Sequence, residues 1–170
     1  MESKLDTQRF ELRSISPIND SFENYISWMK NKESNSFIQG VNVELTIQDL
    51  VNYVWEKNKS KTALLFGIFV KPGNIHIGNV KLEPIMPKKS ATLGILIGEE
   101  SWRGKNVGFE VITRILDFCF QDLDLEMVEL GVNKRNLRAI SLYARLGFIE
   151  SAQESNFSES IRMSISKSTP

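Results

Sequence analysis

The chain has 170 residues, of which 41% are hydrophobic and 25% are charged. This length and composition are typical of one compact domain with a single substantial core. The 21 Lys and Arg residues balance 21 Asp and Glu residues, so the formal net charge is zero. There is no basic block of the kind that binds nucleic acid non-specifically, which excludes DNA or RNA binding as the main function.

Cysteine and histidine each occur once, as Cys119 and His76. One cysteine excludes an internal disulfide, and the two residues together exclude the usual clustered zinc sites, so we expect no metal. The apolar pattern around Cys119 predicts a core position, whereas the alternation around His76 predicts that it points to solvent. No apolar run approaches the roughly 18 residues needed to cross a membrane, and residues 1–4 begin no signal peptide. We therefore expect a soluble, cytoplasmic protein.

A strand and a helix are predicted at the start of the chain. Residues 8–15 alternate between apolar and polar side chains, which indicates a strand with one wetter face. Ser16 followed by Pro17 is typical of a helix N-terminus. Apolar residues then recur at helical spacing to about Asn31, and the polar, unpatterned residues 32–45 predict a loop.

A second helix and a hairpin are expected next. Thr46 is a good N-cap for an amphipathic helix that ends within residues 56–59. Residues 62–70 and 75–83 are rich in β-forming side chains and flank a turn at residues 71–74. This pattern predicts two antiparallel strands joined by that turn.

The second half of the chain alternates strands and helices. After a connection at 84–90, the pattern predicts a strand at 91–98, a long helix at 104–121 and a strand at 125–132. A short helix at 136–146 and two closing strands at 148–153 and 161–165 follow. A strand, a crossover helix and another strand within residues 91–132 demand a parallel pair. We therefore expect an α/β fold with helices on a mixed sheet.

The segment from Trp102 to Gly108 lies between an apolar strand and the longest predicted helix. A glycine-containing turn at a helix N-terminus presents free backbone N–H groups and the positive end of the helix dipole, which suits a phosphate group. The turn also falls at the carboxyl end of a strand, where α/β folds bind their ligands. A nucleotide is one possible ligand, although the turn lacks the ending of a P-loop and the full dinucleotide glycine pattern.

Two motifs together resemble the GNAT family of N-acetyltransferases. Arg103 and Gly108 match the acyl-CoA loop of that family, while Asn106 stands where the family usually has glycine. Asparagine is the non-glycine residue that best tolerates a positive φ. The stretch from Asn136 to Phe148 follows the family's later motif closely, and the predicted order of elements is similar to the family's order.

The resemblance implies the GNAT fold over residues 1–170, with a mixed, mostly antiparallel sheet of about seven strands and helices on both faces. It also implies direct transfer of an acetyl group from acetyl-CoA to a primary amine, without a covalent enzyme intermediate. Residues 7–13 resemble the branch that contains ribosomal-protein and small-amine acetyltransferases. A protein N-terminus, an amino sugar, an amino acid and a polyamine remain open as acceptors, and so do a monomer and a homodimer.

The resemblance further implies which residues contact the acyl donor. Backbone N–H groups of Val107 and Gly108 would hold the pyrophosphate, and main-chain groups at residues 96–98 would line the pantetheine. The N–H of Ile97 would polarise the thioester carbonyl. The expected acetyl-CoA contacts are Leu96, Ile97, Gly98, Arg103, Gly104, Lys105, Asn106, Val107, Gly108, Asn136, Arg138 and Tyr143.

Tyr143 is the expected general acid. It lies two helical turns from Asn136, so both side chains can face one ligand. A leaving thiolate has a conjugate-acid pKa of about 8.5 and a tyrosine hydroxyl about 10, so a phenol against the sulfur can donate the proton. An aliphatic amine must lose a proton, and Glu99, Glu100 and Glu83 are candidate bases between which the sequence does not choose.

Other interpretations remain open from the sequence. The chain can be a non-catalytic GNAT-fold module that binds acyl-CoA or a partner protein, although Tyr143 favours an enzyme. Asn136 can simply cap its helix. Trp28 and Trp55 lie on helix stripes that pack on a sheet, or they border the acceptor site as the first two helices often do in this family.

Overall fold

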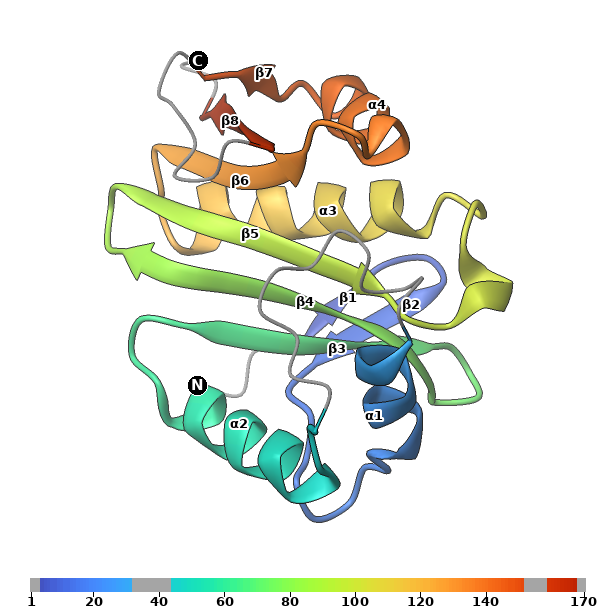
Figure 1. The fold of residues 1–170 in the computed structure, drawn as a ribbon. Helices are drawn as coiled ribbons and strands as arrows, with labels where there is room; N and C mark the ends of the chain where they lie inside the picture. Colours follow the sequence, from blue (N-terminus) through green and yellow to red (C-terminus); the bar gives the residue numbers. More distant parts are fainter. Residues whose placement is uncertain (1–3, 32–43, 152–158, 168–170) are drawn as a thin grey trace.

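The computed structural model describes residues 4–31, 44–151 and 159–167, which form one eight-stranded sheet with helices on its two faces (Figure 1). The order across the sheet is β1-β2-β3-β4-β5-β6-β8-β7. The strands are β1 Leu5–Asp6, β2 Phe10–Arg13, β3 Leu64–Val70, β4 Ile75–Met86, β5 Ser90–Ile97, β6 Met127–Asn133, β7 Ile149–Glu150 and β8 Ser160–Ser166. The α-helices are α1 Glu23–Lys30, α2 Ile47–Lys59, α3 Val107–Asp117 and α4 Leu137–Arg145.

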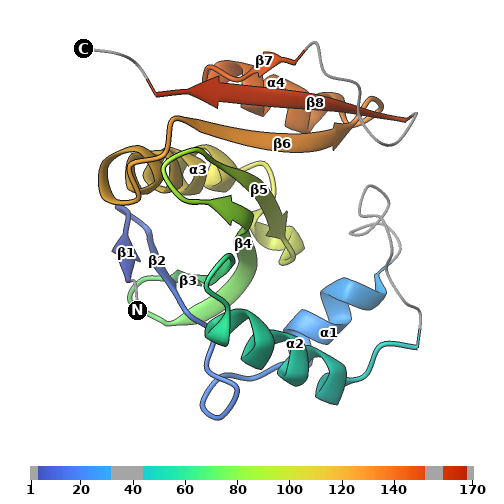
Figure 2. The same cartoon turned by 90° about the vertical axis from the view of Figure 1, so that its left-hand side faces the viewer.

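Two hydrophobic clusters hold the helices on the sheet. Tyr25 and Leu50 belong to the cluster beneath α1 and α2, while Val111 and Ile115 of α3 belong to the larger cluster. Figure 2 shows α1 and α2 on one side of the sheet and α3 on the other. In the described ranges, no helix is both long and apolar enough to cross a membrane.

β5 and β6 form the parallel pair that the crossover predicted, whereas the other strand pairs of the described sheet are antiparallel. Their pairing runs only from Ser90 opposite Met127 to Thr92 opposite Glu129. Beyond Thr92 the two strands diverge, and a pocket lies between residues 93–97 and 131–133. The early end of this pairing is therefore what opens the sheet at its centre.

Two predicted helix starts are confirmed. The Thr46 hydroxyl accepts from the Asp49 N–H at 3.2 Å, and the Asp49 carboxylate accepts from the Thr46 N–H at 2.8 Å. This reciprocal capping box fixes the start of α2. The Asn136 side chain accepts from the Ala139 N–H at 3.1 Å and caps α4 in the same way.

The predicted start of the first helix at Ser16 is wrong, because α1 begins only at Glu23. The Asp20 carboxylate accepts from the Ser16 N–H at 2.6 Å and from the Arg13 guanidinium at 2.7 Å. These bonds hold the segment in a turn, and Ile18, the first apolar residue after Pro17, is 80% exposed. The turn chemistry of Asp20 therefore overrides the helical pattern.

The predicted end of the strand before Pro84 is also wrong. β4 continues to Met86, and a tight turn closed by a 3.0 Å bond from the Lys89 N–H to the Met86 carbonyl leads into β5. The pairing of β4 with β5 shifts register between Leu82 and Ile85. A strand tolerates a proline at such an irregularity, because no hydrogen bond between the strands requires an N–H at that position.

The long helix starts later than predicted. Gly104 has a φ of 75° and Asn106 a φ of 63°, so regular helix begins only at Val107. After Asp117 the chain continues as a π-helical turn, Phe118–Asp122. Of the closing strands, β7 is limited to Ile149–Glu150, and residues 152–153 lie outside the described residues, as do residues 32–43 of the predicted loop.

Candidate active site

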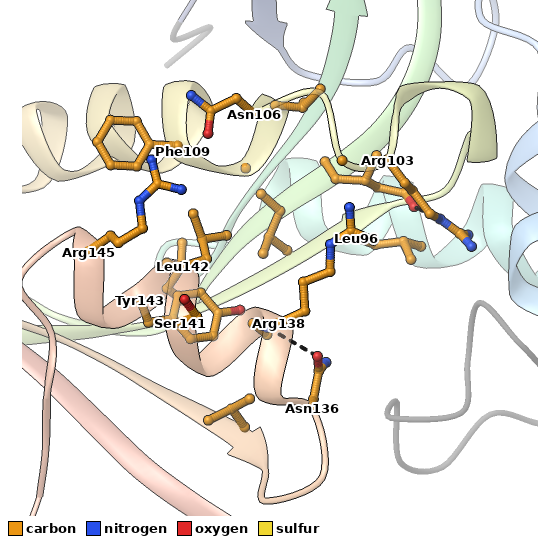
Figure 3. Close-up of a pocket in the computed structure, with 18 of the residues that line it drawn as sticks. Leu96, Arg103, Asn106, Phe109, Asn136, Arg138, Ser141, Leu142, Tyr143 and Arg145 are labelled. Atoms are coloured by element: carbon orange, nitrogen blue, oxygen red, sulfur yellow. Dashed lines mark hydrogen bonds between the residues drawn. The ribbon is translucent and has the colours of Figure 1, made fainter.

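A cavity of about 700 Å³ occupies the gap between β5 and β6. Its walls are residues 93–97 of β5, residues 131–133 of β6, the loop before α3, and one face of α4 (Figure 3). Of the expected acetyl-CoA contacts, ten line it: Leu96, Ile97, Arg103, Gly104, Asn106, Val107, Gly108, Asn136, Arg138 and Tyr143. The structure therefore brings together two motifs that lie far apart in the sequence.

The loop before α3 presents the start of that helix to the cavity. Asn106 precedes α3 in a left-handed conformation and makes no side-chain cap bond. The first N–H groups of a helix have no partner within it, so those of Val107 and Gly108 are available at the pocket. Together with the positive end of the helix dipole, they form a position for an anion.

Arg103 lines the cavity, but its side chain is engaged elsewhere. The Nε group donates to the Ile97 carbonyl at 3.0 Å, and a terminal N–H donates to the Gly98 carbonyl at 3.1 Å. The guanidinium therefore braces the end of β5 against the loop. These bonds occupy two of its donor groups, and its contact with a pyrophosphate stays a prediction.

α4 contacts the start of α3 at successive turns of its own helix. A Cβ on Gly104 would meet the Arg138 guanidinium, and a Cβ on Gly108 would lie 2.8 Å from a Leu142 methyl group. Glycine at both positions permits this close approach, and the φ of 75° at Gly104 independently favours glycine there. Figure 3 shows Arg138 extending across the pocket from α4 toward this loop.

The charge around the cavity is positive. Arg103, Arg138 and Arg145 line it, whereas no Asp or Glu is among its lining residues. Arg138 and Arg145 have no carboxylate partner anywhere in the described parts of the chain. Guanidinium groups left without a counter-charge next to a helix N-terminus favour a phosphate ligand.

Tyr143 lies at the pocket with only 9% of its surface exposed. Its ring packs against Phe148 at a centroid distance of 5.8 Å, and burial raises the pKa of its hydroxyl to about 12. No hydrogen bond to its hydroxyl occurs within the described ranges. The hydroxyl is therefore neutral at physiological pH and available as a donor.

The three glutamates proposed as bases do not line the cavity. Glu83 pairs with Lys57 of α2 at 2.7 Å and with Lys81 at 3.0 Å. Partial burial raises the pKa of Glu83, but the two lysines outweigh this effect and hold the pKa below its usual range. Glu99 and Glu100 lie shortly after β5 and accept bonds from Ser101 and Asn31, respectively.

Two other expected contacts also lie outside the cavity lining. Gly98 is covered by the Trp28 ring, so no larger residue fits there. The Lys105 ammonium lies 5.5 Å from the centroid of the Trp102 ring. Trp28 is buried, whereas Trp55 is 42% exposed on α2.

The prediction that His76 points to solvent is wrong. Its ring stacks on Phe69 at 4.8 Å and meets the edge of Trp28 at 5.0 Å. Its Nε2 lies 3.0 Å from the Gly78 carbonyl and 2.8 Å from the Asn79 side-chain oxygen. Both partners accept, so Nε2 carries the proton, and burial lowers the pKa of the imidazole. Cys119 is fully buried, as predicted.

Sequence reasoning missed Phe109 and Arg145, which also line the pocket. The Arg145 guanidinium lies 5.0 Å from the centroid of the Phe109 ring. Arg145 is two helical turns from Arg138, and this spacing is the signal that could have marked both as facing one ligand. Within the described ranges, no three metal-ligating side chains converge.

The family model of the acetyltransferase (GNAT) domain matches residues 9–149. Human alpha/beta-tubulin-N-acetyltransferase 9 is 26% identical over 156 residues, which cover 85% of this chain and 75% of that protein. YjcK of Bacillus subtilis, named as a probable N-acetyltransferase, is 31% identical over 85 residues, 49% of this chain and 46% of YjcK. The chain thus aligns with about half the length of YjcK.

Solved structures share the fold at low sequence identity. The ribosomal L7/L12 alpha-N-protein acetyltransferase RimL, solved with coenzyme A, has a TM-score of 0.81 at 13% identity, with 96% of this chain and 98% of RimL covered. Spermidine N-acetyltransferase from Vibrio cholerae, solved with CoA and spermine, has a TM-score of 0.77 at 22% identity, with 92% and 95% covered. Since the family model spans most of its length, the chain belongs to the GNAT family of acetyltransferases.

Proposed function

We propose that the protein is an N-acetyltransferase that moves an acetyl group directly from acetyl-CoA to a primary amine. One observation carries this proposal: a single cavity joins the N-terminus of α3, the unpaired cation of Arg138 and the buried hydroxyl of Tyr143. Coenzyme A has phosphates at one end and a thioester at the other, so it needs an anion site and a proton donor in one pocket. RimL and the spermidine enzyme were solved with coenzyme A.

The phosphates would lie at the start of α3. The N–H groups of Val107 and Gly108 would donate to the pyrophosphate, and Arg138 would face it from α4. The pantetheine arm would run along residues 96–97 of β5, with Asn136 on the opposite wall. In this arrangement the thioester, which supplies the acetyl group, reaches the interior of the cavity.

The thioester carbonyl would accept a hydrogen bond from the Ile97 N–H. The end of β5 is shaped for such a contact, because the N–H groups of Gly98 and Glu99 both donate to the Ile77 carbonyl at 3.0 Å. This shared acceptor bends the strand end, and Arg103 holds the Ile97 carbonyl from the other side. A fixed backbone donor at a carbonyl stabilises the negative charge that develops in the transition state.

Tyr143 would donate a hydrogen bond to the departing sulfur. With a pKa of about 12, its hydroxyl remains protonated throughout the working pH range. Full transfer of its proton to a thiolate, whose conjugate acid has a pKa of about 8.5, is uphill. Tyr143 therefore stabilises the sulfur as its charge develops, and the proton released by the amine replaces any that it gives up.

The base for the amine would act through water. Glu83 is held by its lysine pairs away from the pocket. Glu99 and Glu100 follow the end of β5 and are the nearer candidates along the chain, although neither lines the cavity. A water chain would carry the proton from the amine to one of these carboxylates.

The acceptor is proposed as a primary amine: a protein N-terminus, an amino sugar, an amino acid or a polyamine. The names of RimL and of the spermidine enzyme place both a protein and a small amine among the acceptors of related folds. We propose that the reaction needs no metal, nucleic acid or membrane, and that the protein works as a monomer or homodimer. Its only cysteine is buried and unpaired, which fits the reducing cytoplasm.

A panel of amines with acetyl-CoA tests this function. Release of free thiol is measured for spermidine, glucosamine, single amino acids and peptides with free N-termini, beside an amine-free control. Turnover with at least one amine well above the control is expected. Tight binding of acetyl-CoA without turnover on any amine supports the non-catalytic alternative, whereas failure to bind acetyl-CoA contradicts both.

A further inference from the structure

The cavity has a second cationic position at the end opposite Arg103 (Figure 3). There the Arg145 guanidinium lies 5.0 Å from the centroid of the Phe109 ring. Neither the ion pairs nor the hydrogen bonds of the described chain give Arg145 an acidic partner. Among the described residues, therefore, no acidic group neutralises the charge of Arg145.

The two arginines of α4 reach different parts of α3. Arg138 reaches Gly104 in the loop before the helix, whereas Arg145 reaches Phe109 in its first turn. They are two helical turns apart, which is about 10 Å along the axis. The pocket thus offers two separate positions for anionic groups, of which the pyrophosphate of the proposed function uses only the one at Arg138.

We propose that Arg145 binds the 3′-phosphate of the CoA ribose and makes the protein prefer CoA to 3′-dephospho-CoA. This inference rests on the proposed function. In CoA the 3′-phosphate and the diphosphate are attached to the same ribose, so an anion held at the start of α3 brings a second one close by. The spacing of Arg138 and Arg145, two turns apart on α4, matches the diphosphate and the 3′-phosphate as two separate anionic groups.

Phe109 positions the guanidinium for this contact. A ring under one face of an arginine attracts the cation and restricts its motion. The N–H donors of a guanidinium lie in its plane, so they stay free for the two oxygens of a phosphate. Phe109 is therefore a positioning residue for Arg145, and a leucine there would remove the attraction while keeping an apolar side chain.

Binding of CoA and 3′-dephospho-CoA, measured by calorimetry on the whole chain, tests the proposal. The wild-type protein is expected to bind CoA at least about tenfold more tightly, since a charge-assisted bond to phosphate supplies a factor of that size. Arg145→Gln should bring the ratio of the two dissociation constants close to one, mainly because CoA binds more weakly to the variant. Phe109→Leu should give an intermediate ratio.

Two further variants separate this role from a general loss of positive charge. Arg114→Gln removes an arginine of α3 that lies outside the cavity lining and has no ion pair within the described ranges, so it should keep the wild-type ratio. Arg138→Gln should weaken both ligands by a similar factor. Equal binding of both ligands by the wild type, or an unchanged ratio in Arg145→Gln, overturns the inference and leaves the proposed function standing. Failure of both ligands to bind overturns the proposed function as well.

Discussion

Arg9 and Glu110, which are 101 residues apart in the sequence, join the start of β2 to the first turn of α3. The Arg9 N–H donates to one carboxylate oxygen of Glu110 at 2.8 Å, and its Nε donates to the other at 2.7 Å. A terminal N–H of the same guanidinium donates to the Lys105 carbonyl at 3.0 Å. One arginine therefore fixes both the start of α3 and the loop that precedes it.

Glu110→Gln should loosen this connection. The ion pair is partly exposed, so its loss is expected to lower the free energy of unfolding by about 1 kcal/mol. Because Arg9 also holds the loop, acetyl-CoA should bind several-fold more weakly. Chemical denaturation and calorimetry measure the two effects. Glu159→Gln, which removes the exposed pair with Arg135, is the control and should change neither quantity; equal effects of both variants would contradict the role of Arg9.

Tyr143→Phe should reduce kcat by about 10²-fold or more while the affinity for acetyl-CoA stays within about twofold, because only the hydrogen-bond donor is lost. The ring and its packing on Phe148 remain, so the fold should be unaffected. Steady-state kinetics and calorimetry measure the two quantities. Tyr53→Phe on α2, outside the cavity lining, is the matched control. Full activity of Tyr143→Phe would remove it as the donor.

Asn106→Gly should keep or improve the binding of acetyl-CoA. Asn106 has a φ of 63° and its side chain makes no cap bond, so glycine reproduces what the backbone requires. Asn106→Val is the contrasting variant, because a β-branched residue at positive φ is strained by roughly 1–2 kcal/mol. Thermal denaturation and measurement of acetyl-CoA binding should distinguish the glycine variant from the valine variant. Loss of binding in Asn106→Gly alone would show that the side chain itself contacts the ligand.

His76 should make the stability of the protein depend on pH. Burial lowers its pKa in the folded state, so the unfolded chain binds the proton more readily. Its contribution is complete above the unfolded pKa of about 6.5 and is lost as pH falls from there through the folded pKa. The free energy of unfolding should therefore decline between pH 7 and pH 5.

Since His76 is the only histidine, its substitution isolates this effect. His76→Gln keeps a donor for the Asn79 side chain but does not titrate. It should be less stable than the wild type at pH 7.5, with a flatter dependence between pH 7 and pH 5. Urea denaturation at several pH values measures both. An equally steep decline in the variant would assign the dependence to other groups.

Local chemistry made the successful predictions possible. Thr46 and Asn136 cap helices through bonds to residues three positions ahead, so the signal lies within one turn. The parallel pair of β5 and β6 followed from the order of a strand, a helix and a strand. Such features need no knowledge of what the rest of the chain packs against.

The failures involve partners that the local pattern does not reveal. His76 is covered by Trp28 of α1 and Phe69 of β3, which alternation along its own strand cannot show. Asp20 binds Arg13 and stops the predicted helix. In each case a contact between elements outweighs the pattern within one.

Arg103 gives the sharpest contrast between a motif and its geometry. The loop resemblance favours a phosphate contact, whereas its guanidinium donates to the carbonyls of Ile97 and Gly98. If the side chain braces β5, Arg103→Gln should misplace the thioester end of the pocket. Turnover of acetyl-CoA and of acetyl-pantetheine, which has no phosphate, should then fall by similar factors.

Acetyl-pantetheine makes this test decisive, because a lost phosphate contact cannot affect it. Its kcat/KM in Arg103→Gln, relative to the wild type, is compared with that of acetyl-CoA under the same conditions. Arg138→Gln is the matched control, since it should reduce kcat/KM for acetyl-CoA far more than for acetyl-pantetheine. If Arg103 only holds the end of β5 in place, Arg103→Gln should lower kcat/KM by similar factors for both acyl donors. A loss confined to acetyl-CoA would instead mean that Arg103 leaves its two carbonyls and turns to the phosphates when the donor binds.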